Sequence, residues 1–248
     1  MTALILALIA GAVVGLMLGA LGGGSVLAVP ALIYLLGFTP ASATTASLII
    51  VTATSLTALY AHARAGRVRW KAGAAFAAAG ILPAAVAGAA SAHLPQAVLT
   101  LAFAAVAALS ALKMLRPADT ARPKDGGVRP GKAAGAGAAL GTLTGLLGVG
   151  GGFLAVPALV TVLAFEMEAA VGTSLLVITA NSLASLATRS GTAASVDWAL
   201  ISPFIGTAIL GAWDGKRIAA KVSAPHLQRI FAVVLLAVAA FMLADAVT

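Results

Sequence analysis

Residues 15–32, GLMLGALGGGSVLAVPAL, recur as residues 141–159, GTLTGLLGVGGGFLAVPAL, with one residue inserted. The final six residues of both stretches, LAVPAL, are identical at an offset of 127 positions. At the same offset, TATSL at 52–56 returns as TANSL at 179–183. An identity of this length, followed by further matches in a fixed register, indicates an internal duplication of the chain.

The composition around these repeats is that of a membrane protein. The 248 residues are 61% hydrophobic and only 9% charged, and the mean hydropathy is +1.08. A soluble domain carries about 25% charged residues. Residues 1–63 contain no charged side chain at all. Because no segment shows the alternating pattern of barrel strands, the spans must be helices, which satisfy their own backbone hydrogen bonds in lipid.

The apolar runs are long enough to supply several crossings of about 20 residues each. We expect helical spans at 2–20, 25–37, 41–63, 72–91, 95–115, 133–149, 152–164, 168–189, 196–213 and 226–246.

The distribution of basic residues predicts the orientation of these spans. The net charge is +8, and 14 of the 15 Lys and Arg residues fall in 64–71, 113–132 and 216–229. Basic loops of this kind mark the cytoplasmic side of a membrane protein and need no nucleic-acid partner. Segments 1–37 and 133–164 must then each begin and end on one side. Each is therefore predicted to be a helical hairpin, with either two crossings or a partly re-entrant leg.

We therefore expect an all-α polytopic membrane protein built from two inverted-topology repeats. Each repeat is a Gly-broken helical hairpin plus three transmembrane helices. The first repeat covers 1–115, the second covers 133–248, and the polar segment 116–132 is a cytoplasmic linker. Both termini are predicted to lie outside.

The duplicated motif points to a family. The pattern G-x-x-x-G-x-x-G-x-G-G-G-x-x-x-V-P-x-L, followed by A-x-x-T-S-L, resembles the sulfite exporter TauE/SafE family, also called the toluene sulfonate uptake permeases. The likeness covers both halves, and the second copy fits better. The first copy departs from the pattern at 21–25, LGGGS, and at 44–48, TTASL, where the second copy has VGTSL.

The resemblance implies a secondary transporter of small organosulfur or sulfur oxyanions, such as sulfite or sulfonates, in the inner (plasma) membrane. Many members of the family work as exporters, by alternating access around a site between the repeats. Some relatives use cysteines in thiosulfate passage. This chain has no cysteine, so that mechanism cannot be transferred, and disulfides and thiolate metal sites are excluded.

The candidate substrate site is a paired anion site at two glycine clusters. We call 22–24 the first break and 150–152 the second break. A helix broken by glycines exposes backbone N–H groups to a ligand, and a helix that restarts there presents its positive dipole end. Hydroxyl and amide side chains downstream of each break would add donors. The expected substrate-binding residues are Gly22, Gly23, Gly24, Ser25, Thr44, Thr45, Ser47, Gly150, Gly151, Gly152, Thr173, Ser174 and Asn181.

A purely structural interpretation competes with this one. Glycines spaced by four residues, as at Gly11, Gly15 and Gly19 and at Gly141 and Gly145, are typical of close helix packing, and we assign them to it. Serine and threonine side chains also bond back to their own helix or join neighbouring helices. For Ser47 and Ser174 both interpretations stay open.

Two other classes of function share some of these sequence features. An anion channel, or a permease for small carboxylates without sulfur, would use the same glycine-rich helices. A serine hydrolase would need a base close to Ser25, and His62, His93 and His226 belong to other segments. We therefore expect no enzymatic activity, no cofactor and no metal site. The expected partners are the small anion and the lipid bilayer. The coupling ion, proton or sodium, and the choice between monomer and dimer stay open.

Overall fold

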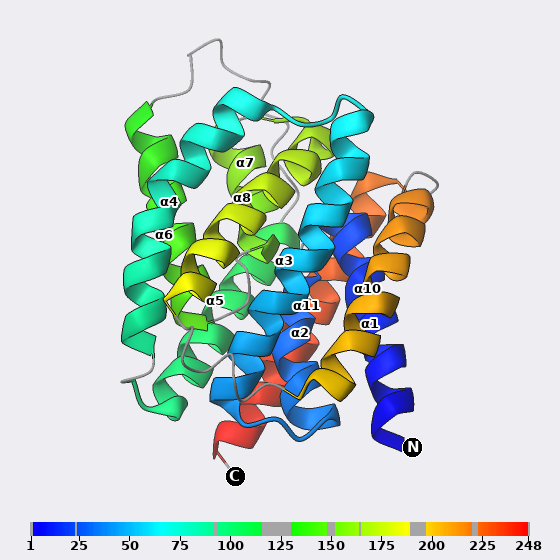
Figure 1. Cartoon of the computed structure of the whole chain (residues 1–248). Helices are drawn as coiled ribbons and strands as arrows, with labels where there is room; N and C mark the ends of the chain where they lie inside the picture. The colour runs from blue at the N-terminus through cyan, green and yellow to red at the C-terminus, as the bar shows by residue number, and fades with distance from the viewer. Residues whose placement is uncertain are drawn as a thin grey trace.

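The computed structural model describes residues 2–22, 24–91, 94–115, 130–147, 152–163, 165–188, 197–219 and 223–247. These residues form helices joined by short connections, without strands (Figure 1). In chain order the elements are α1 (Thr2–Leu21), α2 (Ser25–Pro30), the π-helical turn η1 (Ala31–Leu35), α3 (Pro40–Arg64), α4 (Trp70–Ala90), α5 (Gln96–Leu115), α6 (Pro130–Leu147), α7 (Gly152–Leu163), α8 (Met167–Ala187), α10 (Trp198–Ala219) and α11 (Ala224–Val247).

Four of these helices are long and apolar enough to cross a membrane by themselves: Thr2–Leu21, Ala41–Arg64, Trp70–Ala90 and Glu168–Ala187. The surface agrees with this assignment, because large apolar side chains such as Leu82 and Leu210 are 71% and 67% exposed. A helical membrane protein is therefore confirmed.

The helices match the predicted spans to within a few residues, with one clear difference. The span predicted at 196–213 continues to Ala219. The prediction stopped before Asp214, but α10 carries Asp214 and Arg217 as exposed side chains at its end. A helix C-terminus favours cations, so the basic residues extend the helix beyond its apolar part.

After α1 the chain turns back along that helix, and the returning segment is short. Gly22 ends α1 with a positive φ of 69°, a conformation that glycine adopts without steric cost. The chain then returns through α2 and η1, eleven residues that span about 16 Å at 1.5 Å per residue. This is about half of the 30 Å hydrocarbon core.

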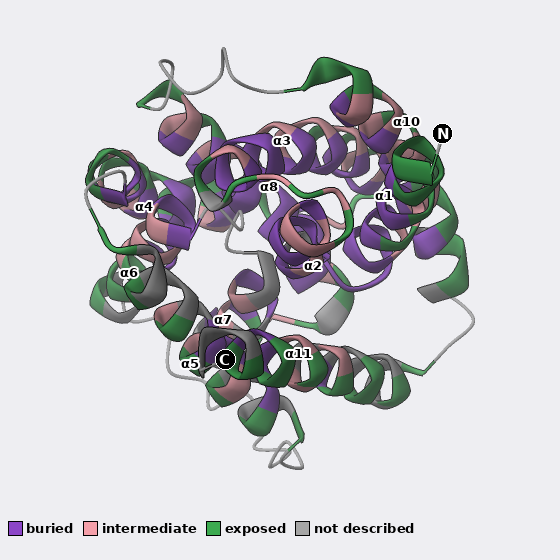
Figure 2. Ribbon diagram, turned by 90° about the horizontal axis from the view of Figure 1, so that it is seen from below, coloured by how far each residue is buried: buried purple, intermediate pink, exposed green. Residues whose placement is uncertain are grey.

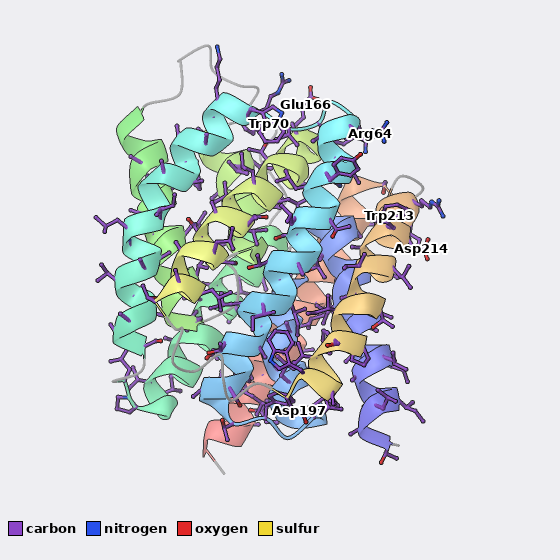
Figure 3. All side chains as sticks on the ribbon, viewed as in Figure 1. Arg64, Trp70, Glu166, Asp197, Trp213 and Asp214 are labelled. Carbon is purple, nitrogen blue, oxygen red and sulfur yellow. The ribbon has the colours of Figure 1, made fainter. Side chains whose placement is uncertain are left out.

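The long helices run between two ends of the bundle. Both chain termini lie at one end (Figure 1). The other end, which we call the basic end, carries Arg64, Trp70 and Glu166, with Trp213 and Asp214 on the same side of the bundle, whereas Asp197 lies near the termini (Figure 3). Helices α3 and α10 therefore run towards the basic end, and α4 and α8 run away from it.

Glycines spaced by four residues bring α1 against α10. A Cβ atom added at Gly11, Gly15 or Gly19 would collide with a backbone carbonyl of α10. These carbonyls belong to Phe204, Ala208 and Ala212, respectively. Helix α1 thus lies directly on the backbone of α10, as the packing interpretation predicts.

The same arrangement joins α6 to α4. Gly137, Gly141 and Gly145 lie against the carbonyls of Phe76, Gly80 and Ala84, again at steps of four residues. These carbonyls precede Phe204, Ala208 and Ala212 by 128 positions in every case. The tightest contacts of the bundle therefore occur twice, and each joins a helix from one half of the chain to a helix from the other half.

Helices α3 and α8 cross inside the bundle. Ser55 of α3 and Thr179 of α8 share a buried hydrogen bond of 2.8 Å. Figure 2 shows buried residues concentrated on α2, α3, α8 and the inner side of α1, and exposed residues around the periphery. The short leg α2 thus lies among long helices and not on the surface.

Candidate substrate site

The first break lies against helices of the second half. Gly22 is buried, and a Cβ atom there would be 2.9 Å from Ser174 Oγ and 3.0 Å from Val156 Cγ2. Ser174 belongs to α8, and Val156 belongs to the second LAVPAL motif in α7. Two of the expected substrate-binding residues, which come from opposite halves of the chain, are therefore neighbours.

Gly24, also in the first break, packs against α1. A Cβ atom at Gly24 would meet the carbonyl of Val14 and the backbone of Leu18. Gly24 precedes the first residue of α2, and no side chain caps this helix start. The glycine therefore lets the return leg lie directly against the outgoing helix.

Ser47 and Ser174 are equivalent by position in the two halves but differ in their bonding. Both are fully buried. Ser174 Oγ donates to the carbonyl of Val171 at 2.7 Å. Ser47 Oγ has no hydrogen-bond partner among the described residues. A buried hydroxyl without a hydrogen-bond partner costs about 1–3 kcal/mol, so the Ser47 hydroxyl, unpaired among the described residues, is a candidate donor to a ligand.

The threonines of the candidate site form hydrogen bonds with backbone groups. Thr44 and Thr45 donate to the carbonyl of Ala41, at 2.9 and 3.2 Å. Thr173 accepts a hydrogen bond from the backbone N–H of Arg69 at 3.0 Å. Arg69 is the N-cap residue of α4, so this bond ties the start of α4 to α8.

Asn181 is directed towards α4. A Cβ atom at Gly80 would lie 2.8 Å from both side-chain heteroatoms of Asn181 and 2.8 Å from the carbonyl oxygen of Gly137. The residue is 1% exposed, and its Oδ1 has no hydrogen-bond partner among the described residues. The structure therefore brings Gly22 and Ser174 together, while Asn181 faces the α4–α6 contact.

Part of the predicted site lies outside the described residues. Gly23, Gly150 and Gly151 belong to that part. Gly152 is the first residue of α7, and Ser25 is the first residue of α2.

The expected binding residues did not include Thr52, Ser182 or Ser185. Their hydroxyl oxygens are also buried and have no hydrogen-bond partner among the described residues. Thr52 and Ser182 are the positional equivalents of Thr179 and Ser55, which bond each other. The repeated segments TATSL and TANSL already placed Ser55 and Thr179 in equivalent regions of the two halves.

The charged side chains that the structure describes lie outside this interior. The described acidic residues Glu166, Glu168, Asp197 and Asp214 are all exposed. Asp197 accepts from the N–H of Ala199 at 3.0 Å and so caps α10. The side-chain atoms nearest to Gly22 are the hydroxyl oxygen of Ser174 and methyl groups of Val156 and Val171.

Comparisons with known proteins agree with this architecture. The family described as "Sulfite exporter TauE/SafE" matches residues 7–242. A protein of Xylella fastidiosa strain 9a5c, named "Probable membrane transporter protein", is 34% identical over 97% of this chain and 95% of its own length. A protein of the same name from strain Temecula1 is 32% identical with the same coverage. No solved structure matches the chain significantly.

The match extends through both glycine motifs and almost every helix described above. On that coverage, the chain belongs to the sulfite exporter TauE/SafE family of membrane transporters.

Proposed function

We propose that this transporter exports a small sulfur-containing oxyanion, such as sulfite or a sulfonate, across the inner membrane. Transport proceeds by alternating access around a site between two inverted repeats, 1–115 and 133–248. The basic end is the cytoplasmic end. The observation that carries the site is the contact between Gly22 and Ser174, in which the broken helix of one half meets the hydroxyl-bearing helix of the other.

Helix direction and packing support the inverted repeats. Equivalent helices run in opposite directions: α3 towards the basic end and α8 away from it, α10 towards it and α4 away from it (Figure 1). The α1–α10 and α4–α6 contacts are equivalent glycine contacts. In transporters with this symmetry the substrate binds near mid-membrane at the interface of the repeats.

The chemistry of the interior supports an anion. Sulfite and sulfonates spread their charge over three oxygens, and neutral O–H and N–H donors suit such a group. The buried hydroxyl of Ser47 has no partner among the described residues, and no described carboxylate is buried where it would repel an anion.

The test is flux in proteoliposomes that contain the purified full-length protein. We expect saturable uptake of radiolabelled sulfite that is accelerated when unlabelled sulfite is loaded on the opposite side. Competition should be stronger with thiosulfate, sulfoacetate or toluene sulfonate than with acetate or succinate.

Two outcomes would redirect the assignment. Flux that does not saturate and shows no acceleration from the opposite side would identify an anion channel. Stronger competition by the carboxylates would make the protein a carboxylate permease. Robust transport of an organic cation, without sulfonate binding at millimolar concentration, would reject an anion site altogether.

A further inference from the structure

A pocket lies at the basic end, away from the candidate substrate site. Its volume is about 440 Å³, within the range of pockets that hold small ligands. It opens between the C-terminal parts of α3 and α10, and the loop before α4 adds one residue. Its polar and aromatic lining consists of Tyr60, His62, Arg64, Arg67, Trp213 and Arg217.

Three guanidinium groups line this pocket, and each has N–H donors to spare. Arg64 contacts Tyr60, with its Nη1 donating to the phenol oxygen at 3.4 Å and its guanidinium carbon 5.8 Å from the ring centre. Arg67 pairs with Glu168 at 3.2 Å and Arg217 with Asp214 at 3.4 Å.

These acidic partners do not close the pocket to an anion. The carboxylate-bearing side chains of Glu168 and Asp214 are 70% and 64% exposed, and exposed ion pairs are weak. A guanidinium has five N–H donors, so one carboxylate contact leaves others for a phosphate. Phosphate is a group that arginine binds with two parallel hydrogen bonds.

The side chains that extend from the pocket away from the basic end indicate which kind of molecule would carry the bound anion. On α3, Leu56, Tyr60 and Arg64 follow at steps of four residues and therefore share one face. All three are exposed, Leu56 at 55% and Tyr60 at 61%. The order along this face is aliphatic, aromatic and cationic towards the basic end.

Helix α10 repeats that order beside α3. Leu210, Trp213 and Arg217 follow at steps of three and four residues and are all exposed, Leu210 at 67% and Trp213 at 52%. Trp213 lies at the same end of the bundle as Arg64 (Figure 3). Both faces thus follow the profile of a membrane leaflet, in which acyl chains give way to an aromatic interface and then to charged headgroups.

We propose that this pocket binds the headgroup of an anionic phospholipid from the cytoplasmic leaflet. The phosphate lies between Arg64 and Arg217, and the acyl chains extend along the faces that Leu56 and Leu210 define. A free oxyanion would use the arginines but would gain nothing from the exposed aliphatic and aromatic side chains below them. This site does not depend on the identity of the transported anion.

Lipid binding to the full-length protein in a neutral detergent tests the proposal. Native mass spectrometry would measure binding of dioleoylphosphatidylglycerol and of dioleoylphosphatidylcholine, and inorganic phosphate would be added as a competitor. We expect tighter binding of phosphatidylglycerol and no displacement by millimolar phosphate.

Substitutions locate the site. An interfacial arginine contributes about a fivefold factor to the binding of anionic lipid. Arg64→Gln and Arg217→Gln should therefore each weaken the binding of phosphatidylglycerol about fivefold, and together about twenty-five-fold. Arg64→Lys should retain most of the binding. Arg229→Gln is the matched control, because Arg229 is exposed on α11 and does not line the pocket; it should change binding by less than twofold.

Three results would overturn the inference. Equal affinity for the two lipids would reduce the pocket to ordinary lipid contact. Displacement of the lipid by inorganic phosphate would identify a site for free anions. An effect of Arg229→Gln as large as that of Arg64→Gln would show that only the overall charge matters.

Discussion

Replacing Ser47 with alanine should make the empty transporter more stable and its substrate binding weaker. Ser47 is fully buried in α3, and its Oγ has no hydrogen-bond partner among the described residues. The substitution removes one oxygen atom and leaves the rest of the side chain in place. Opposite effects on stability and affinity distinguish a ligand-binding hydroxyl from one that only supports the fold.

The expected changes in stability and in affinity both follow from the hydrogen bonding of the Ser47 hydroxyl. Relief of an unsatisfied buried donor stabilises the empty protein by about 1–3 kcal/mol, or about 2–4 °C in melting temperature for each kcal/mol at this chain length. A hydrogen bond to a charged ligand contributes about 1.5–3 kcal/mol. Its loss should weaken sulfite binding about ten- to a hundredfold.

Thermal melting of the empty protein and calorimetric titration with sulfite measure the two effects. Thr54→Val is the matched control, because Thr54 lies on the same helix, is 1% exposed and already donates to the carbonyl of Ile50 at 2.7 Å. We expect the control to bind sulfite within twofold of the parent. A lower melting temperature for Ser47→Ala would show that the hydroxyl has a protein partner, and unchanged affinity would remove Ser47 from the site.

Three further predictions concern the fold. Gly15→Ala should destabilise the protein by about 1–3 kcal/mol, because the new methyl group would collide with the backbone of α10. Gly206→Ala is the control: nothing lies within 4 Å of its new methyl group, so it should be neutral or stabilising by up to about 1 kcal/mol. Equal melting temperatures for the two variants would contradict the glycine contact between α1 and α10. Thr179→Val should lower the stability by about 0.6 kcal/mol, a typical value for a hydrogen bond between membrane helices. Adding Ser55→Ala to Thr179→Val should lower the stability little further, and a double-mutant cycle measures this coupling. A single cysteine at Asp125, in a chain that has no other, should react with a membrane-impermeant maleimide only after the cells are opened; labelling of intact cells would reverse the orientation.

Much of this fold could be predicted from the sequence because the signals are strong and local. Long uncharged runs mark the helices, and the basic stretches separate the two ends of the bundle. The four-residue spacing of the glycines at 11, 15 and 19 is sufficient to predict close helix packing. The identity of their partner could not be predicted, because alanine-rich faces such as that of α10 occur on most helices of this chain.

The candidate site shows the same division. Gly22 and Ser174 were predicted and lie together. Thr173, next to Ser174 in sequence, bonds the start of α4 instead. Adjacent positions on a helix point about 100° apart, and only the three-dimensional arrangement tells which of them reaches the break. The sequence also could not predict that the Ser47 hydroxyl has no partner among the described residues, because a buried serine ordinarily bonds to the backbone of its own helix.

The glycine contact between α1 and α10 has a consequence for biosynthesis. Roughly 190 residues separate Gly19 from its partner Ala212, and at 5–20 residues per second the ribosome needs about 10–40 s to supply them. Helix α1 is therefore made well before α10, and its glycine face lacks this partner during that interval. Membrane insertion of α1 is thus expected to precede its packing against α10, and any factor that shields the glycine face of α1 during that interval should raise the yield of folded transporter.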